Sequence, residues 1–161
     1  MATLYGTEYN NAFVAVPSIK IQPGDQSGTM KFMYFDYPIT ASLPTAGDII
    51  KVGKIPKNVR VFDAGLYFSD LGTAGLLELG WAASAELDSL GAPVEAASPS
   101  GLMSAIDVFT VGRVLRASND DANPAGVLKN FAAEVDLQIV VTTAWTAVSG
   151  VLRGWVAYIG V

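Results

Sequence analysis

Apolar and polar residues alternate along several short stretches of this chain, which is typical of strands that bury one face. The clearest stretch, residues 134–143, begins with strict alternation, and residues 59–69 and 76–82 show the same period. The expected inward faces are Val135, Leu137, Ile139 and Val141, then Phe62, Ala64, Leu66 and Phe68 with Arg60 at the rim, then Leu77, Leu79 and Trp81. Because successive side chains of a strand point to opposite sides, each set shares one face.

Two other stretches are apolar on both faces. Residues 30–37 are rich in aromatic side chains and end at Pro38, and residues 151–161 combine branched and aromatic side chains. Such side chains favour strands. A strand that is apolar on both sides lies inside a sandwich, or its outer face meets a neighbour. Both interpretations are open for these two strands.

Short runs of turn-forming residues separate three of the predicted strands. Residues 56–58 lie between strands at 48–54 and 59–69, and residues 70–75 lie between the second of these and 76–82. Both runs contain the proline, asparagine or glycine that tight turns favour. We therefore expect two consecutive hairpins.

The segment from about 84 to 123 has a different composition, rich in Ala, Ser, Gly and Pro. We interpret it as a long insertion with short helices at 84–90 and 99–107, because a serine cap and a proline in the first turn begin the second of these. A short strand follows at 108–111. The whole pattern predicts an all-β domain, an antiparallel β-sandwich with jelly-roll-like connections, over residues 29–161.

Residues 1–28 have no regular period and contain Pro17, Pro23 and Gly24, which predicts an extended N-terminal arm. The arm holds many apolar side chains for a solvated segment, so we expect it to pack on a neighbouring chain. The predicted partner-interface residues are Tyr5, Tyr9, Phe13 and Val16 of the arm, together with Trp145.

Charge is scarce in this chain. Charged residues make up 16%, against about 25% in ordinary soluble domains. No run approaches the roughly 20 apolar residues of a membrane-spanning helix, so we expect no membrane partner and favour assembly with protein neighbours. The first eight residues show neither region of a signal peptide, so we expect synthesis and assembly in a cytoplasm.

The net charge of −5 argues against nucleic acid as the main partner. One basic cluster, Lys51, Lys54, Lys57 and Arg60, is interrupted by Pro56, and these side chains do not share one strand face. We interpret the cluster as a solvated or protein-facing turn.

The chain contains no histidine and no cysteine, which excludes Ser-His-Asp triads, thiol catalysis and His-based zinc sites. Paired carboxylates are the remaining route to catalysis, with Asp63, Glu78, Glu134 and Asp136 as the candidates on strands. Nothing resembles a catalytic motif, so we expect no enzyme, no cofactor and no metal. The Asx-rich residues 119–123 lack the EF-hand pattern, and a surface turn is a better interpretation than a calcium site.

The tryptophans raise a glycan-binding alternative. Trp81 and Trp155 lie on predicted strands, whereas Trp145 lies in a predicted turn beside Thr143 and Thr146 and is a candidate exposed platform for sugars. A tail or receptor-binding module is therefore the alternative function. A carboxylate hydrolase acting on cell-wall sugars is a third.

Three segments of the sequence resemble a known group of proteins. They are LYGTEY at 4–9, DIIKVGKIPKNVRVFDAGLYFSDLGTAGLLELGW at 48–81 and VLRGWVAYIGV at 151–161. They are similar to small virion structural proteins encoded beside the major capsid protein in tailed bacteriophages. The resemblance implies a head decoration or cement protein, a β-sandwich homotrimer that binds the major capsid protein lattice in the virion.

Overall fold

The structure, a computed structural model, describes residues 29–39, 44–69, 71–72, 74–108, 114–116, 124–146 and 150–161. The predicted arm and the Asx-rich residues 119–123 lie outside the described residues. The strands are β1 (Lys31–Ile39), β2 (Ile49–Ile55), β3 (Val59–Phe68), β4 (Leu76–Trp81), β5 (Ser98–Asp107), β6 (Val114–Arg116), β7 (Asn130–Phe131), β8 (Val135–Thr143) and β9 (Gly150–Gly160), with one 3-10 turn, η3 (Pro124–Gly126). Among the described residues, no helix has the length and hydropathy of a membrane span.

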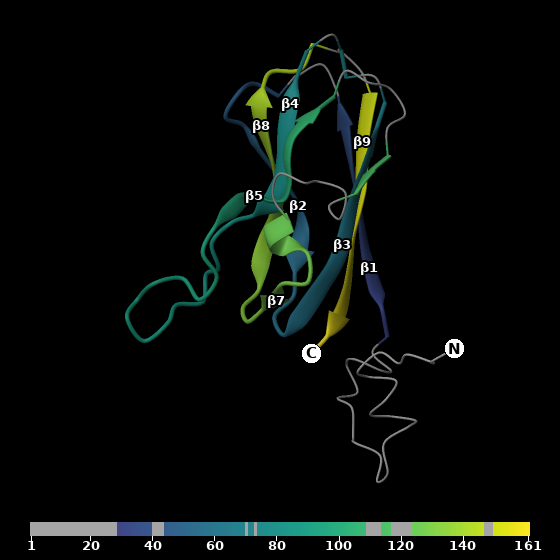
Figure 1. Cartoon of the computed structure of the whole chain (residues 1–161). Helices are drawn as coiled ribbons and strands as arrows, with labels where there is room; N and C mark the ends of the chain where they lie inside the picture. Colours follow the sequence, from purple (N-terminus) through teal and green to yellow (C-terminus); the bar gives the residue numbers. More distant parts are fainter. Residues whose placement is uncertain are drawn as a thin grey trace, which may run out of the picture.

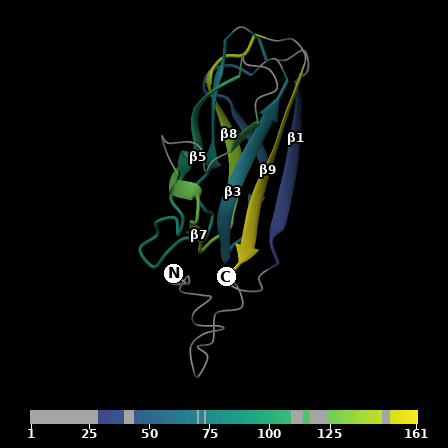
Figure 2. The ribbon, with the colours of Figure 1, turned by 45° about the vertical axis from the view of Figure 1, so that its right-hand side comes forward.

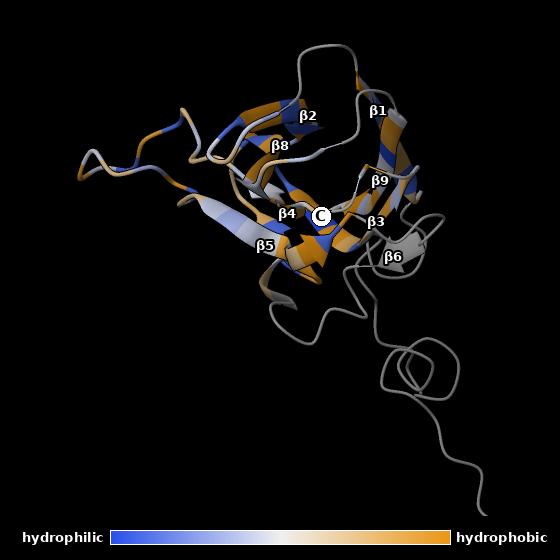
Figure 3. Ribbon diagram, turned by 90° about the horizontal axis from the view of Figure 1, so that it is seen from above, coloured by the Kyte–Doolittle hydropathy of each residue, from blue (hydrophilic) through white to orange (hydrophobic). Residues whose placement is uncertain are grey.

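The strands form two sheets that pack face to face (Figures 1 and 3). The first sheet has the order β1-β9-β3-β6, with β7 beside β3, and the second has the order β2-β8-β4-β5. All strand pairs are antiparallel. The chain crosses between sheets at most connections, which is the topology of a jelly roll. The predicted all-β, jelly-roll-like sandwich is confirmed.

The predicted consecutive hairpins are wrong. β2 pairs with β8, and β3 pairs with β9, so β2 and β3 lie in different sheets. β3 and β4 are separated in the same way. The turn residues do reverse the chain, but period-two alternation marks only which face is buried, and it does not say which sheet a strand joins.

The short helices predicted in the insertion are also wrong. Residues 98–107 form β5, which pairs with β4 at the edge of the second sheet. A Cβ at Gly80 of β4 would overlap the backbone of Ser98 and Pro99, so this glycine permits the close approach of the two strands. Residues 84–90 belong to a loop. Tertiary pairing therefore overrides the local helix-start signal.

The core lies between the sheets and contains most of the predicted inward side chains. Those confirmed as buried are Ala64, Leu66, Phe68, Leu77, Leu79, Trp81, Val135, Leu137, Ile139 and Val141. Phe62 and Arg60 are exceptions, because a bulge between Val61 and Asp63 shifts the alternation and turns Val61 inward. Burial of each large apolar side chain contributes about 1.5–3 kcal/mol.

Candidate assembly surface

The outer face of the first sheet exposes large aromatic side chains. Phe32 and Tyr34 of β1 are 49% and 74% exposed, whereas Phe35, the next residue after Tyr34, points to the opposite side, into the core. Trp155 of β9 lies directly opposite Tyr34 in the strand register. Phe32, Tyr34, Arg153 and Trp155 are called the aromatic face below. Exposed aromatic side chains gathered on one face are typical of protein interfaces.

A glycine on the neighbouring strand makes room for the indole of Trp155. Gly65 of β3 is the register partner of Trp155, and a Cβ at this position would overlap the indole ring. The ring therefore lies against the sheet instead of standing away from it. Phe32 contacts it edge-on, with ring centroids 6.1 Å apart, and stacks on Tyr34 at 6.0 Å. Both separations fall in the favourable range for aromatic pairs.

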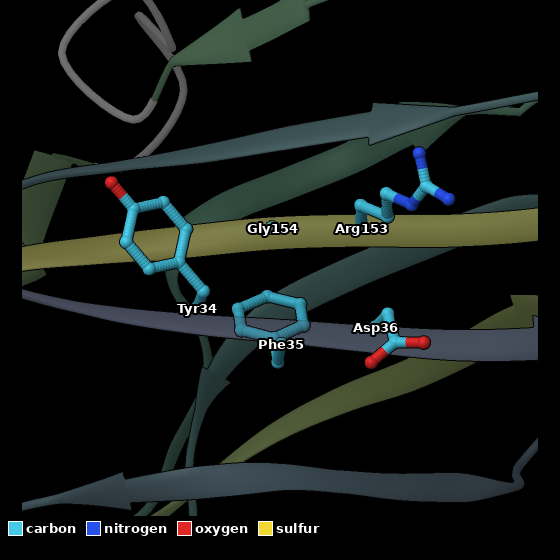
Figure 4. Close-up of a pocket in the computed structure, with 5 residues that line it drawn as sticks. All are labelled: Tyr34, Phe35, Asp36, Arg153 and Gly154. Carbon is cyan, nitrogen blue, oxygen red and sulfur yellow. The ribbon is translucent and has the colours of Figure 1, made fainter.

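An open hollow of about 400 Å³ adjoins the aromatic face (Figure 4). Tyr34 lies on one side of it, and Asp36 and Arg153 lie on the other, on neighbouring strands. Asp36 and Arg153 are also register partners. Gly154 lies between Tyr34 and Arg153, and its lack of a side chain leaves space for the ring of Phe35 on the inner side of the sheet. The surface thus combines aromatic rings with one acidic and one basic side chain.

A second exposed feature is the connection between β4 and β5, residues 82–97, called the projecting loop below. It extends away from the sandwich in two views (Figures 1 and 2). Backbone hydrogen bonds cross it, from Ser84 N to Glu95 O at 2.9 Å and from Val94 N to Glu86 O at 2.9 Å. At the tip, the Asp88 carboxylate accepts hydrogen bonds from the backbone N–H of Leu90 and Ala92. Internal hydrogen bonds therefore fix the conformation of the loop, including its tip.

The base of the projecting loop is fixed to the sandwich by a buried carboxylate. Glu95 is 6% exposed and pairs with Lys129 at 2.7 Å. It also accepts a hydrogen bond from the Ala132 N–H at 2.8 Å. The indole N–H of Trp81 donates to Ala96 O at 3.0 Å, and the Lys129 ammonium lies 5.1 Å from the ring centroid of Phe131. These contacts orient the loop relative to the core.

The outer face of the second sheet is charged. Lys51 pairs with Asp136 at 2.7 Å, and Lys54 pairs with Glu134 at 2.6 Å. The hydrogen bond from Lys51 holds the pKa of Asp136 below its ordinary value, and the hydrogen bond to Glu134 raises the pKa of Lys54. Two lysines of the basic cluster, Lys51 and Lys54, are therefore engaged by carboxylates. Glu134 and Asp136 thus lie on the solvated side of the second sheet, each paired with a lysine.

The structure brings two of the carboxylate candidates for catalysis together, since Glu134 and Asp136 line one small hollow with Lys54. Glu134 and Asp136 each hold a lysine, as described above, and Asp63 accepts a hydrogen bond from the backbone N–H of Ala64. Across the residues that the structure describes, no group of three or more potential metal ligands comes together.

The predicted partner-interface residues fall into two groups. Tyr5, Tyr9, Phe13 and Val16 lie outside the described residues, so their role stays a prediction. Trp145 is 2% exposed, and the prediction that it forms an exposed platform is wrong. Its indole packs against Gly75, where a Cβ would contact the ring. The prediction rested on the neighbouring threonines, Thr143 and Thr146. They are exposed, but the indole of Trp145 points into the core.

Part of the candidate assembly surface is predictable from the sequence. The pattern of residues 30–37 leaves open an outer face at an interface, and the exposure of Phe32 and Tyr34 agrees with that alternative. The sequence did not indicate the projecting loop, although the turn-forming residues Gly91 and Pro93 lie within the segment interpreted as an insertion.

Comparison with solved structures finds the same fold in one chain of a phage capsid. A chain from the capsid of Ralstonia phage GP4 superposes with a TM-score of 0.62 at 20% identity, and the match covers 88% of this chain and 92% of that one. A chain of the cyanophage Pam1 capsid asymmetric unit gives a TM-score of 0.49 at 20% identity, over 93% and 99% of the two chains. No protein-family model matches the sequence, and no curated protein matches it. The chain thus shares a jelly-roll fold with the first of these capsid chains.

Proposed function

We propose that this chain is a structural subunit of a bacteriophage particle, and that it decorates the head as a cement protein. The aromatic face is the observation that carries the proposal. Exposed aromatic side chains and arginine are the residues that most often dominate binding at protein interfaces. The shared fold with a capsid chain of Ralstonia phage GP4, over nearly the full length of both chains, supports a place in a virion.

The proposed mechanism is the addition of contact area to the capsid lattice. The aromatic face would be covered by neighbouring chains, either copies of this protein in a homotrimer or the major capsid protein. The apolar residues of the arm, Tyr5, Tyr9, Phe13 and Val16, would add to the same contacts. A subunit stabilised in this way shares its stability with its neighbours and holds them together. No catalytic step is part of this function.

Cosedimentation with purified heads tests the proposal. We expect the protein to pellet with heads, and Tyr34→Ser to lower the bound fraction at least tenfold, because a central aromatic contact is lost. Lys57→Ser is the matched control, since Lys57 is exposed at a turn and lies outside the aromatic face. A wild-type protein that stays in the supernatant contradicts the proposal, and so does equal binding of the Tyr34 variant.

A second candidate is a tail or receptor-binding module for host glycans. The observation that favours it is the hollow, which has an exposed tyrosine ring at one end and an aspartate and an arginine at the other. Such a combination allows stacking on a sugar and hydrogen bonds to its hydroxyls. Binding on a glycan array that is lost in Arg153→Ala would favour this function, and an empty array would remove it.

A further inference from the structure

We infer that the projecting loop of one copy packs on the aromatic face of a second copy, in a head-to-tail contact. The inference rests on the proposed function, because it names the partner of the same surface. The loop contributes Leu87, Leu90 and the carboxylate of Glu86, and the face contributes Phe32, Tyr34 and Arg153.

A head-to-tail contact between copies requires two different surfaces on different sides of the molecule, and the projecting loop and the aromatic face meet this requirement. The loop leaves the sandwich from the second sheet, and the aromatic face belongs to the first sheet, so they lie on different sides of the molecule (Figure 3). The loop and the first residues of β1 lie toward the same end of the sandwich in both side views (Figures 1 and 2). Rotational symmetry about an axis along the sandwich brings together surfaces at the same height. Every copy then donates a loop and receives one, as in cyclic trimers.

The loop carries apolar side chains that have no partner surface within the described residues. Leu90 at the tip is 90% exposed, and Leu87 and Val94 are exposed beside it. A single exposed leucine needs no explanation. Here, however, the carboxylate of Asp88 holds the tip backbone and the buried Glu95 fixes the base. An apolar tip on a preorganised support loses little conformational entropy when it binds, which favours a role in contact.

The acidic loop has one basic side chain to pair with on the aromatic face, Arg153, which lies opposite Asp36 in the strand register. Residues 85–94 contain two acids, Glu86 and Asp88, and no base. The aromatic face carries Arg153, which is exposed beside the rings. A contact that places the leucines over Phe32 and Tyr34 leaves the exposed Glu86 free to approach the guanidinium. Such a pair at the rim contributes mainly to orientation and register.

Cysteine cross-linking tests this contact cleanly, because the chain has no cysteine of its own. Ser89→Cys marks the exposed loop tip, and Asp36→Cys marks the sheet beside the aromatic face. The two single variants are mixed, allowed to assemble, and treated with a short bismaleimide. We expect a covalent pair that contains one chain of each variant. Lys51→Cys, on the outer face of the second sheet, replaces Asp36→Cys as the matched control and should give at least tenfold less product.

Three outcomes overturn the inference: no product with Asp36→Cys, equal product with Lys51→Cys, or product that is unchanged when Leu90→Ser is added to the loop partner. Both single variants keep residues 1–22, because we expect the arm to add to the same assembly contacts. Cosedimentation with heads is measured on the same samples. Head binding without the cross-link refutes only this contact, whereas the cross-link without head binding refutes only the role on the capsid.

Discussion

The indole ring of Trp155 lies against Gly65, in the space that a Cβ on residue 65 would occupy. The absence of a side chain at this position of β3 thus allows the aromatic ring on the neighbouring strand β9 to lie close to the sheet. Trp155 is half-buried, with its remaining surface beside Phe32. The relationship links a backbone position to the shape of the proposed assembly surface.

Gly65→Ala should displace the indole of Trp155 toward solvent and leave the fold intact. The ring is a side chain at the surface and has room to move, so we expect a loss of about 1–2 kcal/mol in the free energy of unfolding. Trp81 and Trp145 are buried, so a red shift in tryptophan emission reports on Trp155. Gly160→Ala is the control, because a Cβ there meets nothing within 4 Å. An unchanged emission spectrum in Gly65→Ala contradicts the described packing.

Much of the core was predictable from the sequence. Apolar and polar side chains alternate along a strand according to which of its faces meets solvent, and this pattern is visible without knowing the fold. The faces of β4 and β8 followed directly from this period. The sheet partners were not predictable, since β2 and β3 are joined by turn residues and yet pair with β8 and β9. The inward orientation predicted for Phe62 was wrong, because the bulge between Val61 and Asp63 depends on strand pairing and leaves no pattern in the local sequence. Trp145 was misplaced because polar neighbours do not report the direction of one side chain.

Glu95→Ala should release the base of the projecting loop. It leaves Lys129 without its carboxylate partner and removes the acceptor of the Ala132 N–H. Breaking a largely buried, hydrogen-bonded pair that keeps some solvent contact costs about 2–3 kcal/mol. Limited proteolysis should cut within residues 82–97 faster than in the wild type. Glu86→Ala, which changes an exposed carboxylate of the same loop, should leave the cleavage rate unchanged, and an equal rate in Glu95→Ala would show that the anchor is unnecessary.

The Lys51–Asp136 pair predicts a small loss of stability in acid. The pKa of Asp136 is lower in the folded chain than its ordinary value, because Lys51 donates a hydrogen bond to the carboxylate. Its contribution is therefore complete above the unfolded pKa of about 4 and is lost as pH falls through the lower folded value. Solvent screens the pair, so the effect is about 0.5 kcal/mol. Urea unfolding gives the free energy of unfolding at pH 7 and at pH 3. The decrease between the two pH values should be smaller for Asp136→Asn than for the wild type, and an equal decrease would show that the Lys51–Asp136 pair does not contribute.

Deletion of residues 1–22 should leave a folded sandwich, because the described strand pairs begin at Lys31. We expect the circular dichroism spectrum of the truncated chain to retain its β signature. The arm contains several apolar side chains whose burial contributes about 1.5–3 kcal/mol each at most, so assembly should weaken by orders of magnitude. Sedimentation velocity measures that change. An unfolded truncated chain would make the arm part of the core, and normal assembly would make it dispensable.

The most direct test of the proposed function is electron cryomicroscopy of phage heads that carry this protein. The account predicts density for the sandwich on the outer surface of the head, with Phe32, Tyr34 and Trp155 covered by a neighbouring chain. Absence of the protein from the head, or its presence with these three side chains open to solvent, would contradict the account.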